Sequence, residues 1–420
     1  MDNEINVYSR NTQPSQVKLV SGKGAQVFDS NGKRLIDCCS QTLNSNLGQC
    51  HPEIISAVET QVNKLTYASS RFSSDVSEQL HKRLVQITPE PLTTVNLANV
   101  TGSLANEGAV KMARKKTNRS LVISRERSHL GQSFETMRIS GKHENTKFLG
   151  KRNVEFFPAP YCFRCPLGLK SETCDAECLT PLENIQKICG DDVAAVIVEP
   201  IMVDAGVLIP KKNYHKRLQS FCKSNSIPLI WDEIQTAFGW LCTTFAMDLY
   251  DVVPDILTLG KGLGAGFPIA ATVFRAEFDV LEYGDHEFTA GAHPVSCAAS
   301  LAMLNVLKKP GFFEKISVVA QYIESRLRAL KNISSVIGDV RGHGFLFGVE
   351  FVTKEGNYPN TEITKKIFEE LMRNGVVTRV SRVGAHSNVI QFKPPIIMTM
   401  DQAEEALTIF EKVVRQASIA

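Results

Sequence analysis

The chain has 420 residues, 43% of them hydrophobic and 22% charged, with a formal net charge of +3. This composition is typical of a globular protein with an ample core, and it excludes the disordered and collagen-like classes. The small charge excess indicates no nucleic-acid partner. No apolar run reaches the roughly 20 residues that span a bilayer, and residues 1–4 do not resemble a secretion signal. We expect a cytoplasmic protein that binds neither membrane nor nucleic acid.

The first predicted element is a hairpin over residues 25–37. Two apolar stretches flank Asn31 and Gly32, a residue pair that favours a tight turn.

A glycine and two hydroxyls precede the next informative element. Thr101, Gly102 and Ser103 lead into a helical pattern that begins at Ala105, and the basic residues 111–116 indicate the C-terminal end of that helix. Helix N-terminal amides attract anions, and glycine allows close approach of a phosphate. Ser or Thr before a helix is also a common N-cap, so the sequence leaves both interpretations open.

A cysteine cluster follows. Of the eleven cysteines in the chain, four lie close together in a segment with no clear helix or strand period, namely Cys162, Cys165, Cys174 and Cys178. Such spacing can bind zinc. The longer gap in the second pair argues against a metal, and a fold of this size needs none. Redox pairing or simple packing remain open, and we assign no metal ligand.

The middle of the chain alternates short apolar runs with helical patterns. The predicted buried strands are residues 193–198, 227–231, 256–259 and 269–274. Alternation of this kind predicts a mostly parallel sheet flanked by helices.

The pattern changes near residue 311. A long helix is predicted up to residue 330, then a strand over 345–350, an amphipathic helix over 363–372 and a last helix over 403–414. We predict an N-terminal segment, residues 1–50, that packs with a smaller C-terminal domain, residues 311–420, and a large domain over residues 51–310 between them.

An acid and a lysine follow two of the predicted strands. Asp232 comes directly after residues 227–231, and Lys261 comes shortly after residues 256–259. Parallel strands would bring both to one sheet edge. A lysine can hold a pyridoxal phosphate aldehyde as a Schiff base, while a carboxylate keeps the pyridine nitrogen protonated. On these two residues alone, a solvated cation and a capping acid are equally good interpretations.

The surrounding segments resemble the class III aminotransferases, which are fold-type I pyridoxal phosphate enzymes. Residues 232–236 and 254–268 are similar to the family's acid and lysine segments, in the same order and at a matching separation. The likeness extends from about residue 24 to the last helix. It implies an α/β large domain with a mostly parallel central sheet and a smaller α+β domain.

The resemblance also implies roles for individual residues. Lys261 would form the Schiff base, Asp232 would pair with the pyridine nitrogen and Gln235 would contact the phenolic oxygen. Gly102 and Ser103 match the phosphate-binding motif.

Three further positions follow from the same resemblance. His129 stands where an aromatic residue stacks on the cofactor ring, and Glu199 matches a glutamate that lines the active site. Thr289 matches a threonine that one subunit sends to its neighbour's cofactor phosphate, which implies a homodimer.

The sequence departs from the family pattern around the substrate. Gln391 stands where an arginine often binds the substrate α-carboxylate, so a bidentate clamp is missing. Lys393, two residues on and on the same strand face, or Arg382, nearby in the sequence, could supply one contact. Trp240 stands at a position where members of the family often have another arginine. These departures favour an ω-amine, a diamine or a bulky amino donor.

The leading hypothesis is therefore amino transfer from an amino acid, ω-amino acid or diamine to an oxo acid or aldehyde. A racemase, epimerase or decarboxylating enzyme on the same fold is the alternative. An inactive binding protein is disfavoured because Lys261, Asp232 and Gln235 are intact.

Overall fold

The computed structural model describes residues 17–142, 147–383 and 386–419. The first 16 residues of the predicted N-terminal segment therefore lie outside the description. No helix in the described ranges is both long and apolar enough to cross a membrane.

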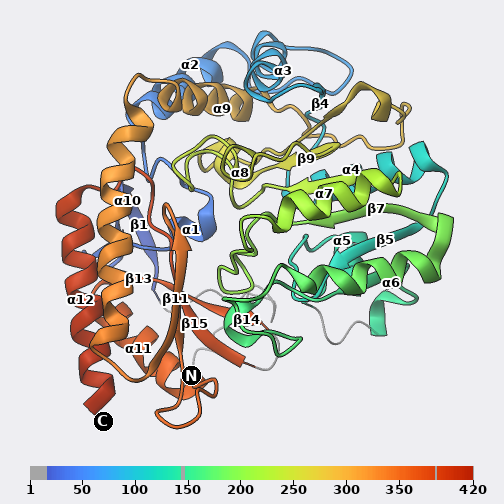
Figure 1. Cartoon of the computed structure of the whole chain (residues 1–420). Coiled ribbons are helices and arrows are strands. Elements are labelled where there is room, and N and C mark those ends of the chain that lie inside the picture. The colour runs from blue at the N-terminus through green and yellow to red at the C-terminus, as the bar shows by residue number, and fades with distance from the viewer. Residues whose placement is uncertain (1–16, 143–146, 384–385, 420) are drawn as a thin grey trace, which may run out of the picture.

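A seven-stranded sheet forms the centre of the larger part of the molecule (Figure 1). In spatial order its strands are β4 (Leu92–Asn96), β10 (Ala271–Arg275), β9 (Ile256–Leu259), β8 (Leu229–Asp232), β7 (Val193–Val198), β5 (Leu121–Arg125) and β6 (Val154–Phe157). Only β10 runs antiparallel to its neighbours in this sheet. The predicted mostly parallel sheet is confirmed.

Both faces of this sheet are buried, as β7 illustrates. Ala195 and Ile197 pack in one apolar cluster with Ala109, whereas Val196 and Val198 belong to the main core. Successive side chains of a strand point to opposite faces, so burial on both faces requires an unbroken apolar run. This requirement explains why the central strands could be predicted from the sequence.

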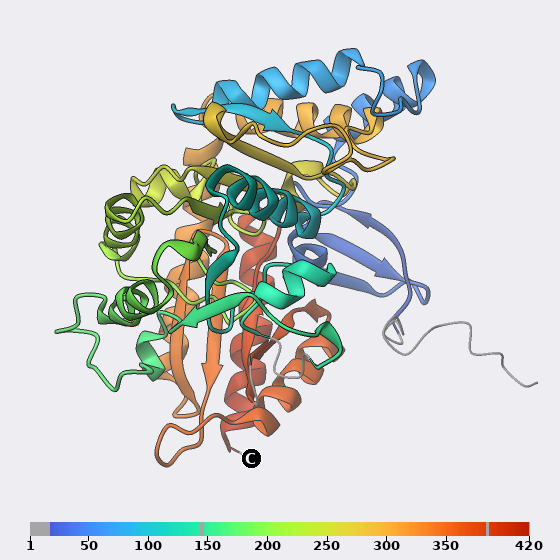
Figure 2. The ribbon, with the colours of Figure 1, turned by 90° about the vertical axis from the view of Figure 1, so that its right-hand side faces the viewer.

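Helices and short turns surround the large sheet. The helices are α2 (Pro52–Lys64), α3 (Asp75–Ile87), α4 (Gly102–Thr117), α5 (Phe134–Ile139), α6 (Thr180–Cys189), α7 (Tyr214–Ser224), α8 (Ala246–Tyr250) and α9 (Pro294–Leu307). The 3-10 turns of the described residues are η1 (Lys147–Leu149), η2 (Cys162–Arg164), η3 (Glu177–Leu179), η4 (Gly190–Asp192), η5 (Lys261–Gly264), η6 (Ala276–Phe278) and η7 (Leu330–Asn332). Figure 2 shows α2 and α3, in light blue, packed against α9 at the top of the molecule.

The C-terminal part is an antiparallel sheet with helices. Its strands, in spatial order, are β11 (Ile337–His343), β12 (Leu346–Phe351), β15 (His386–Phe392) and β14 (Arg379–Val383). Its helices are α10 (Phe312–Ala329), α11 (Thr361–Arg373) and α12 (Met400–Ile419), and α10 and α12 run side by side along one side of the molecule (Figure 1).

A third small sheet joins the two ends of the chain. The N-terminal strands β1 (Leu19–Lys23), β2 (Gln26–Asp29) and β3 (Arg34–Asp37) form a meander, and the parallel strand β13 (Val376–Val377) pairs with β3. The N-terminal strands therefore contact the C-terminal part. The domain limits at residues 50 and 310 stay a prediction.

Candidate active site

Two parallel strands bring the expected acid and lysine to one edge of the large sheet. Asp232 is the last residue of β8 and pairs with Thr258 of β9, which ends just before Lys261. Both side chains line one cavity of about 360 Å³, so the predicted meeting of the two strand ends is confirmed. The predicted site residues that line this cavity are Gly102, Ser103, His129, Asp232, Gln235 and Lys261.

Asp232 is a buried carboxylate that is held from two sides. Its Oδ1 accepts a hydrogen bond from the backbone N–H of Ile234 at 2.9 Å, and its Oδ2 accepts one from Nδ2 of Asn106 at 2.7 Å. Burial raises the pKa of Asp232 to about 6, although both hydrogen bonds oppose that rise. A carboxylate has four lone-pair positions, so acceptor capacity remains for a cation in the cavity.

Asn106 on α4 orients Asp232, a role that the sequence analysis did not assign. Its Oδ1 accepts a 2.6 Å hydrogen bond from Oγ1 of Thr258, and its Nδ2 also donates to the carbonyl of Leu130 at 2.8 Å. The sequence did contain a hint of this role. Asn106 stands among the apolar residues of a predicted helix, and a buried amide needs polar partners.

Lys261 begins the turn η5 with a backbone φ of +41°, a conformation that non-glycine residues rarely adopt. Such strain is typical of functional sites. Burial lowers the pKa of the Lys261 amine, while Asp232 and Asp204 act in the opposite direction. Among the described residues the amine has no hydrogen bond or ion pair, so it is available to react.

The N-terminus of α4 forms one end of the cavity. Thr101 caps the helix by accepting a 3.4 Å hydrogen bond from the N–H of Leu104, and Gly102 and Ser103 line the space beyond. A Cβ at Gly102 would lie 2.6 Å from the Ile234 side chain, so only glycine fits without displacing it. Thr101 is thus an N-cap, and the exposed helix end can also bind an anion.

Glu199 supports the wall that carries His129 and Gln235. Its Oε1 accepts a hydrogen bond from the backbone N–H of His129 at 3.0 Å, and its Oε2 accepts a long one from Nε2 of Gln235 at 3.5 Å. Burial, together with the charge of Asp232, raises the pKa of Glu199 to about 8. Glu199 is therefore mostly a neutral acid near pH 7, and it lies behind the lining residues.

A left-handed turn, labelled α1 (Ser40–Leu43), closes another side of the cavity. All four of its residues have φ between +46° and +67°, although none is glycine. Asp37 holds the turn by accepting hydrogen bonds from the N–H of Cys39 at 2.9 Å and from Nε2 of Gln41 at 3.0 Å. Gln41 and Thr42 line the cavity. The sequence did not predict the left-handed conformation of this turn, because the residues that usually adopt it are glycines and the turn contains none.

An ion cluster around Asp204 lies near His129, which lines the cavity. Asp204 is 8% exposed, forms an ion pair with Lys142 and accepts a 3.3 Å hydrogen bond from Nη2 of Arg379. Although burial acts against ionisation, His129, Lys142 and Arg379 hold the pKa of Asp204 well below its usual range. This cluster could not be predicted from the sequence, because Lys142, Asp204 and Arg379 come from segments far apart in the chain.

Small-domain side chains hold the loop that carries Asp204. The carbonyl of Val203 accepts a hydrogen bond from Nε2 of Gln391 at 2.6 Å. The carbonyl of Asp204 accepts one from Oγ of Ser381 at 2.6 Å, and that of Gly206 accepts one from Nε of Arg341 at 2.8 Å. The position of Asp204 thus depends on both parts of the molecule.

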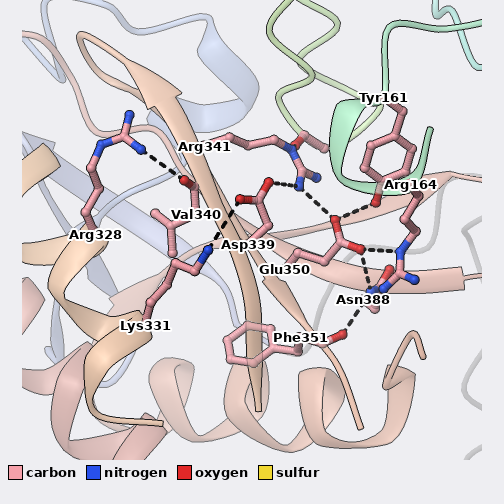
Figure 3. A network of polar contacts seen from close by, with 11 residues as sticks. Tyr161, Arg164, Arg328, Lys331, Asp339, Val340, Arg341, Glu350, Phe351 and Asn388 are labelled. Carbon is pink, nitrogen blue, oxygen red and sulfur yellow. Dashed lines mark hydrogen bonds and ion pairs between the residues drawn. The ribbon is translucent and has the colours of Figure 1, made fainter. Parts of the chain in front are cut away.

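A buried network around Glu350 of β12 fixes Arg341 (Figure 3). The Glu350 side chain is fully buried and accepts hydrogen bonds from Nη1 of Arg341 at 2.7 Å, from the hydroxyl of Tyr161 at 2.5 Å and from Nε of Arg164 at 2.6 Å. Although burial opposes ionisation, Arg341 and these hydrogen bonds lower the pKa of Glu350. The network ties Tyr161 and turn η2, which contains Arg164, to the C-terminal part of the molecule.

We expect the Glu350→Gln substitution to lower the free energy of unfolding by about 3 kcal/mol. It removes the charge partner of Arg164 and one of the two carboxylates that pair with Arg341, the other being Asp339 at 3.0 Å. The urea concentration at the unfolding midpoint measures this loss. Glu362→Gln is the control, since Glu362 pairs with Lys366 at 2.9 Å on the exposed surface of α11 and its loss should not shift the midpoint. Equal midpoints for both variants would contradict a stabilising role.

The structure does not bring the three expected substrate residues to the cavity. Gln391 and Lys393 are 0% and 1% exposed, and Nζ of Lys393 donates to Oε1 of Gln391 at 2.6 Å. Burial lowers the pKa of Lys393 to about 8. Trp240 is 0% exposed and packs in the main core. None of the three lines the cavity, since β15 lies inside its sheet and Gln391 is bonded to Val203. Their contact with the substrate stays a prediction.

Thr289 lies on the exposed surface between η6 and α9 and does not line the cavity of its own chain. Its carbonyl accepts a 2.8 Å hydrogen bond from the hydroxyl of Tyr67, which follows α2. The Thr289 side chain is therefore presented outward rather than to this chain's own Asp232 and Lys261.

The four clustered cysteines lie near one another on the segment that carries Tyr161 and Arg164. Burial raises the pKa of Cys178 to about 12, and the neighbouring Cys174, Cys162 and Cys165 contribute to the rise. All eleven cysteines are free. In the described ranges no group of three or more His, Cys, Asp and Glu side chains is arranged to hold a metal ion.

Comparison with known proteins gives a consistent picture. The model of the aminotransferase class-III family matches residues 7–414. An acetylornithine aminotransferase of Caldanaerobacter subterraneus is 31% identical over 95% of this chain and 95% of its own length. A leucine/methionine racemase of Thermococcus litoralis is 30% identical over 95% of this chain and 90% of its own. The structure of an ω-aminotransferase from Paracoccus denitrificans superimposes with a TM-score of 0.90 at 26% identity, covering 99% and 97% of the two chains.

Proposed function

Because the chain belongs to the class III aminotransferase family and is a pyridoxal phosphate-dependent enzyme, we propose that Lys261 and Asp232 carry out its amino transfer. The donor is an amino acid, an ω-amino acid or a diamine, and the acceptor is an oxo acid or an aldehyde. One observation supports this assignment: a lysine amine without a partner among the described residues meets a buried carboxylate in one cavity at a helix N-terminus.

The residues around the cavity fit pyridoxal phosphate. The cofactor supplies an electron-accepting ring and an aldehyde. Asp232 has acceptor capacity left for the ring N–H, and Gly102 and Ser103 present the amides of α4 to the phosphate. His129 lies on the cavity wall, where its imidazole can stack on the ring. Among the described residues the Gln235 amide donates one hydrogen bond, a long one to Glu199, so the amide can turn toward the phenolic oxygen.

Lys261 has two tasks in this proposal. Its amine would hold the cofactor through the aldehyde and, after displacement by an amino donor, would take up the proton that leaves the donor carbon. Burial lowers the pKa of the amine, which enlarges the neutral fraction that both tasks need.

We assign Thr289 to the cofactor phosphate of a second copy of the chain. Its exposed position, away from this chain's own cavity, supports a homodimer in which each subunit completes the site of its partner. A cytoplasmic location is part of the same proposal.

Racemisation is the second candidate, because the Thermococcus litoralis relative is named a racemase. The same lysine could return the proton to the opposite face of the donor carbon instead of passing it on. The aminotransferase relatives and the family model favour amino transfer.

A single-turnover experiment distinguishes the two reactions. The purified, cofactor-loaded protein is mixed with α-amino acids, ω-amino acids and diamines, and cofactor absorbance, oxo product and donor stereochemistry are followed. We expect a change in cofactor absorbance together with stoichiometric oxo product. Inversion of the donor without oxo product would establish racemisation, and no change with any donor would contradict both.

A further inference from the structure

The hydrogen bonds of Asp37 determine which end of the Gln41 amide is free. Gln41 belongs to the left-handed turn α1 and lines the cavity, whereas Asp37, the last residue of β3, does not line it. We propose that Asp37 is a positioning residue, which holds Gln41 so that the amide oxygen accepts a hydrogen bond from the second polar group of the amino donor. That group is an N–H donor, such as the distal amine of a diamine. This inference rests on the proposed function and narrows its range of donors.

Asp37 accepts hydrogen bonds with both of its carboxylate oxygens. The residue is 1% exposed, its Oδ1 accepts from the N–H of Cys39 at 2.9 Å, and its Oδ2 accepts from Nε2 of Gln41 at 3.0 Å. Burial raises the pKa of Asp37, while the Gln41 side chain and the neighbouring backbone N–H groups act against that rise. An ionised carboxylate can only accept, so the Gln41 amide must present its NH2 to Asp37. Its oxygen Oε1 therefore points away from Asp37.

The backbone of α1 fixes the place of Gln41. All four residues of the turn have a positive φ, which is unfavourable for residues that carry a Cβ. Such a run persists only where surrounding contacts hold it. Besides Asp37, these contacts are a 2.7 Å hydrogen bond from Oγ of Ser40 to the carbonyl of Lys393 and the burial of Leu43 in the main core. The direction of the Gln41 side chain is thus determined by the fold around the turn.

The amide oxygen of Gln41 is available to the amino donor. Gln41 is half-buried, and within the described ranges the hydrogen bond of its side chain is the one to the carboxylate behind it. The groups proposed for the cofactor, namely the end of α4, Asp232 and Lys261, line other parts of the cavity. Thr42 and Asn44 also line it, but a hydroxyl and an amide that can turn over either donate or accept. Gln41 therefore gives this side of the cavity an acceptor of fixed orientation, which favours an N–H over a carboxylate.

The Asp37→Asn substitution tests the inference because it reverses the Gln41 amide. The introduced NH2 would donate to Oε1 of Gln41, so Gln41 would turn its own NH2 to the cavity, while Cys39 keeps its acceptor. The kcat and KM of the cofactor-loaded protein are measured with putrescine and with γ-aminobutyrate, a diamine and an ω-amino acid of equal chain length. We expect the ratio of kcat/KM for putrescine to that for γ-aminobutyrate to fall roughly 10- to 100-fold, mainly through KM. Gln41→Met, which removes the acceptor, should lower the same ratio.

Asp29→Asn is the matched control. Asp29 is also a buried carboxylate at the end of a strand of the same small sheet, and it holds a turn by accepting N–H bonds from Asn31 and Lys33, both at 2.9 Å. It does not line the cavity, so the ratio for Asp29→Asn should equal that of the wild type. Melting temperatures check that each variant is folded, and a mere loss of stability would affect both donors alike.

Donor binding is also followed without turnover, through the absorbance of the bound cofactor. The wild type should bind putrescine more tightly than γ-aminobutyrate, and Asp37→Asn should lose this preference. A wild type that prefers γ-aminobutyrate, or an unchanged ratio in both Asp37→Asn and Gln41→Met, would overturn the inference while amino transfer stands. If the wild type forms no carbonyl product but Asp37→Asn still loses the preference for putrescine, the proposed function fails and the donor site remains.

Discussion

Replacing Lys261 by alanine is expected to abolish amino transfer and covalent attachment of the cofactor. Alanine has neither the amine that binds the aldehyde nor the base that moves the donor proton, and the loss of proton transfer alone costs roughly 10²- to 10⁴-fold in rate. Lys261 is suited to both tasks because it lines the cavity with Asp232 and has no other partner among the described residues. The rate is measured as oxo product formed in a single turnover.

Covalent attachment provides a readout that does not depend on turnover. After borohydride reduction, the wild-type protein should gain the mass of the cofactor on the peptide that contains Lys261, and the Lys261→Ala protein should gain none. Lys212→Ala, at an exposed position, is the control and should behave as the wild type does. A Lys261→Ala protein that turned over at the wild-type rate would refute the assignment of Lys261.

The Asp232→Asn substitution is expected to leave a cofactor-binding protein that has lost most of its rate. Both oxygens of Asp232 accept hydrogen bonds from N–H groups, those of Ile234 and Asn106, so the NH2 of an asparagine would face a donor in either orientation. The amide also lacks the charge that stabilises a protonated ring nitrogen. Loss of such an electrostatic partner costs roughly 10²- to 10³-fold in kcat.

The rate of Asp232→Asn is therefore compared per bound cofactor, with occupancy taken from absorbance. Asp255→Asn is the matched control, because Asp255 is also a largely buried carboxylate that accepts a backbone hydrogen bond, from Leu229 at 2.8 Å, but lies at the opposite end of β9. Asp255→Asn should lower stability without lowering the rate per bound cofactor. Equal rates for Asp232→Asn and the wild type would exclude Asp232 as the partner of the ring nitrogen.

Much of the large domain could be predicted because its strands are buried on both faces. The predicted strands at residues 193–198 and 256–259 coincide with β7 and β9, and that at 227–231 is displaced by about two residues from β8. The hairpin over residues 25–37 is present as β2 and β3. In each case a local pattern, either an unbroken apolar run or an Asn–Gly turn, is enough to specify the element.

The acid and the lysine of the candidate active site could also be predicted from local patterns. Asp232 and Lys261 stand out in the sequence because charged residues follow apolar strands, and parallel strands end at one edge. The motif around Gly102 was visible because a helix needs an N-cap.

By itself, then, the sequence determined the strands of the large sheet, the acid and the lysine at its edge and the helix end beside them, since each depends on residues close together in the chain. Only the tertiary structure decided that Gln391 is buried against Val203, that Arg379 lies opposite it and that Asp204 is held between Lys142 and Arg379. These features depend on strand register and on packing between the two parts of the molecule. A shift of one residue in that register would turn Arg379 to the other face of the sheet, and no local pattern fixes the register.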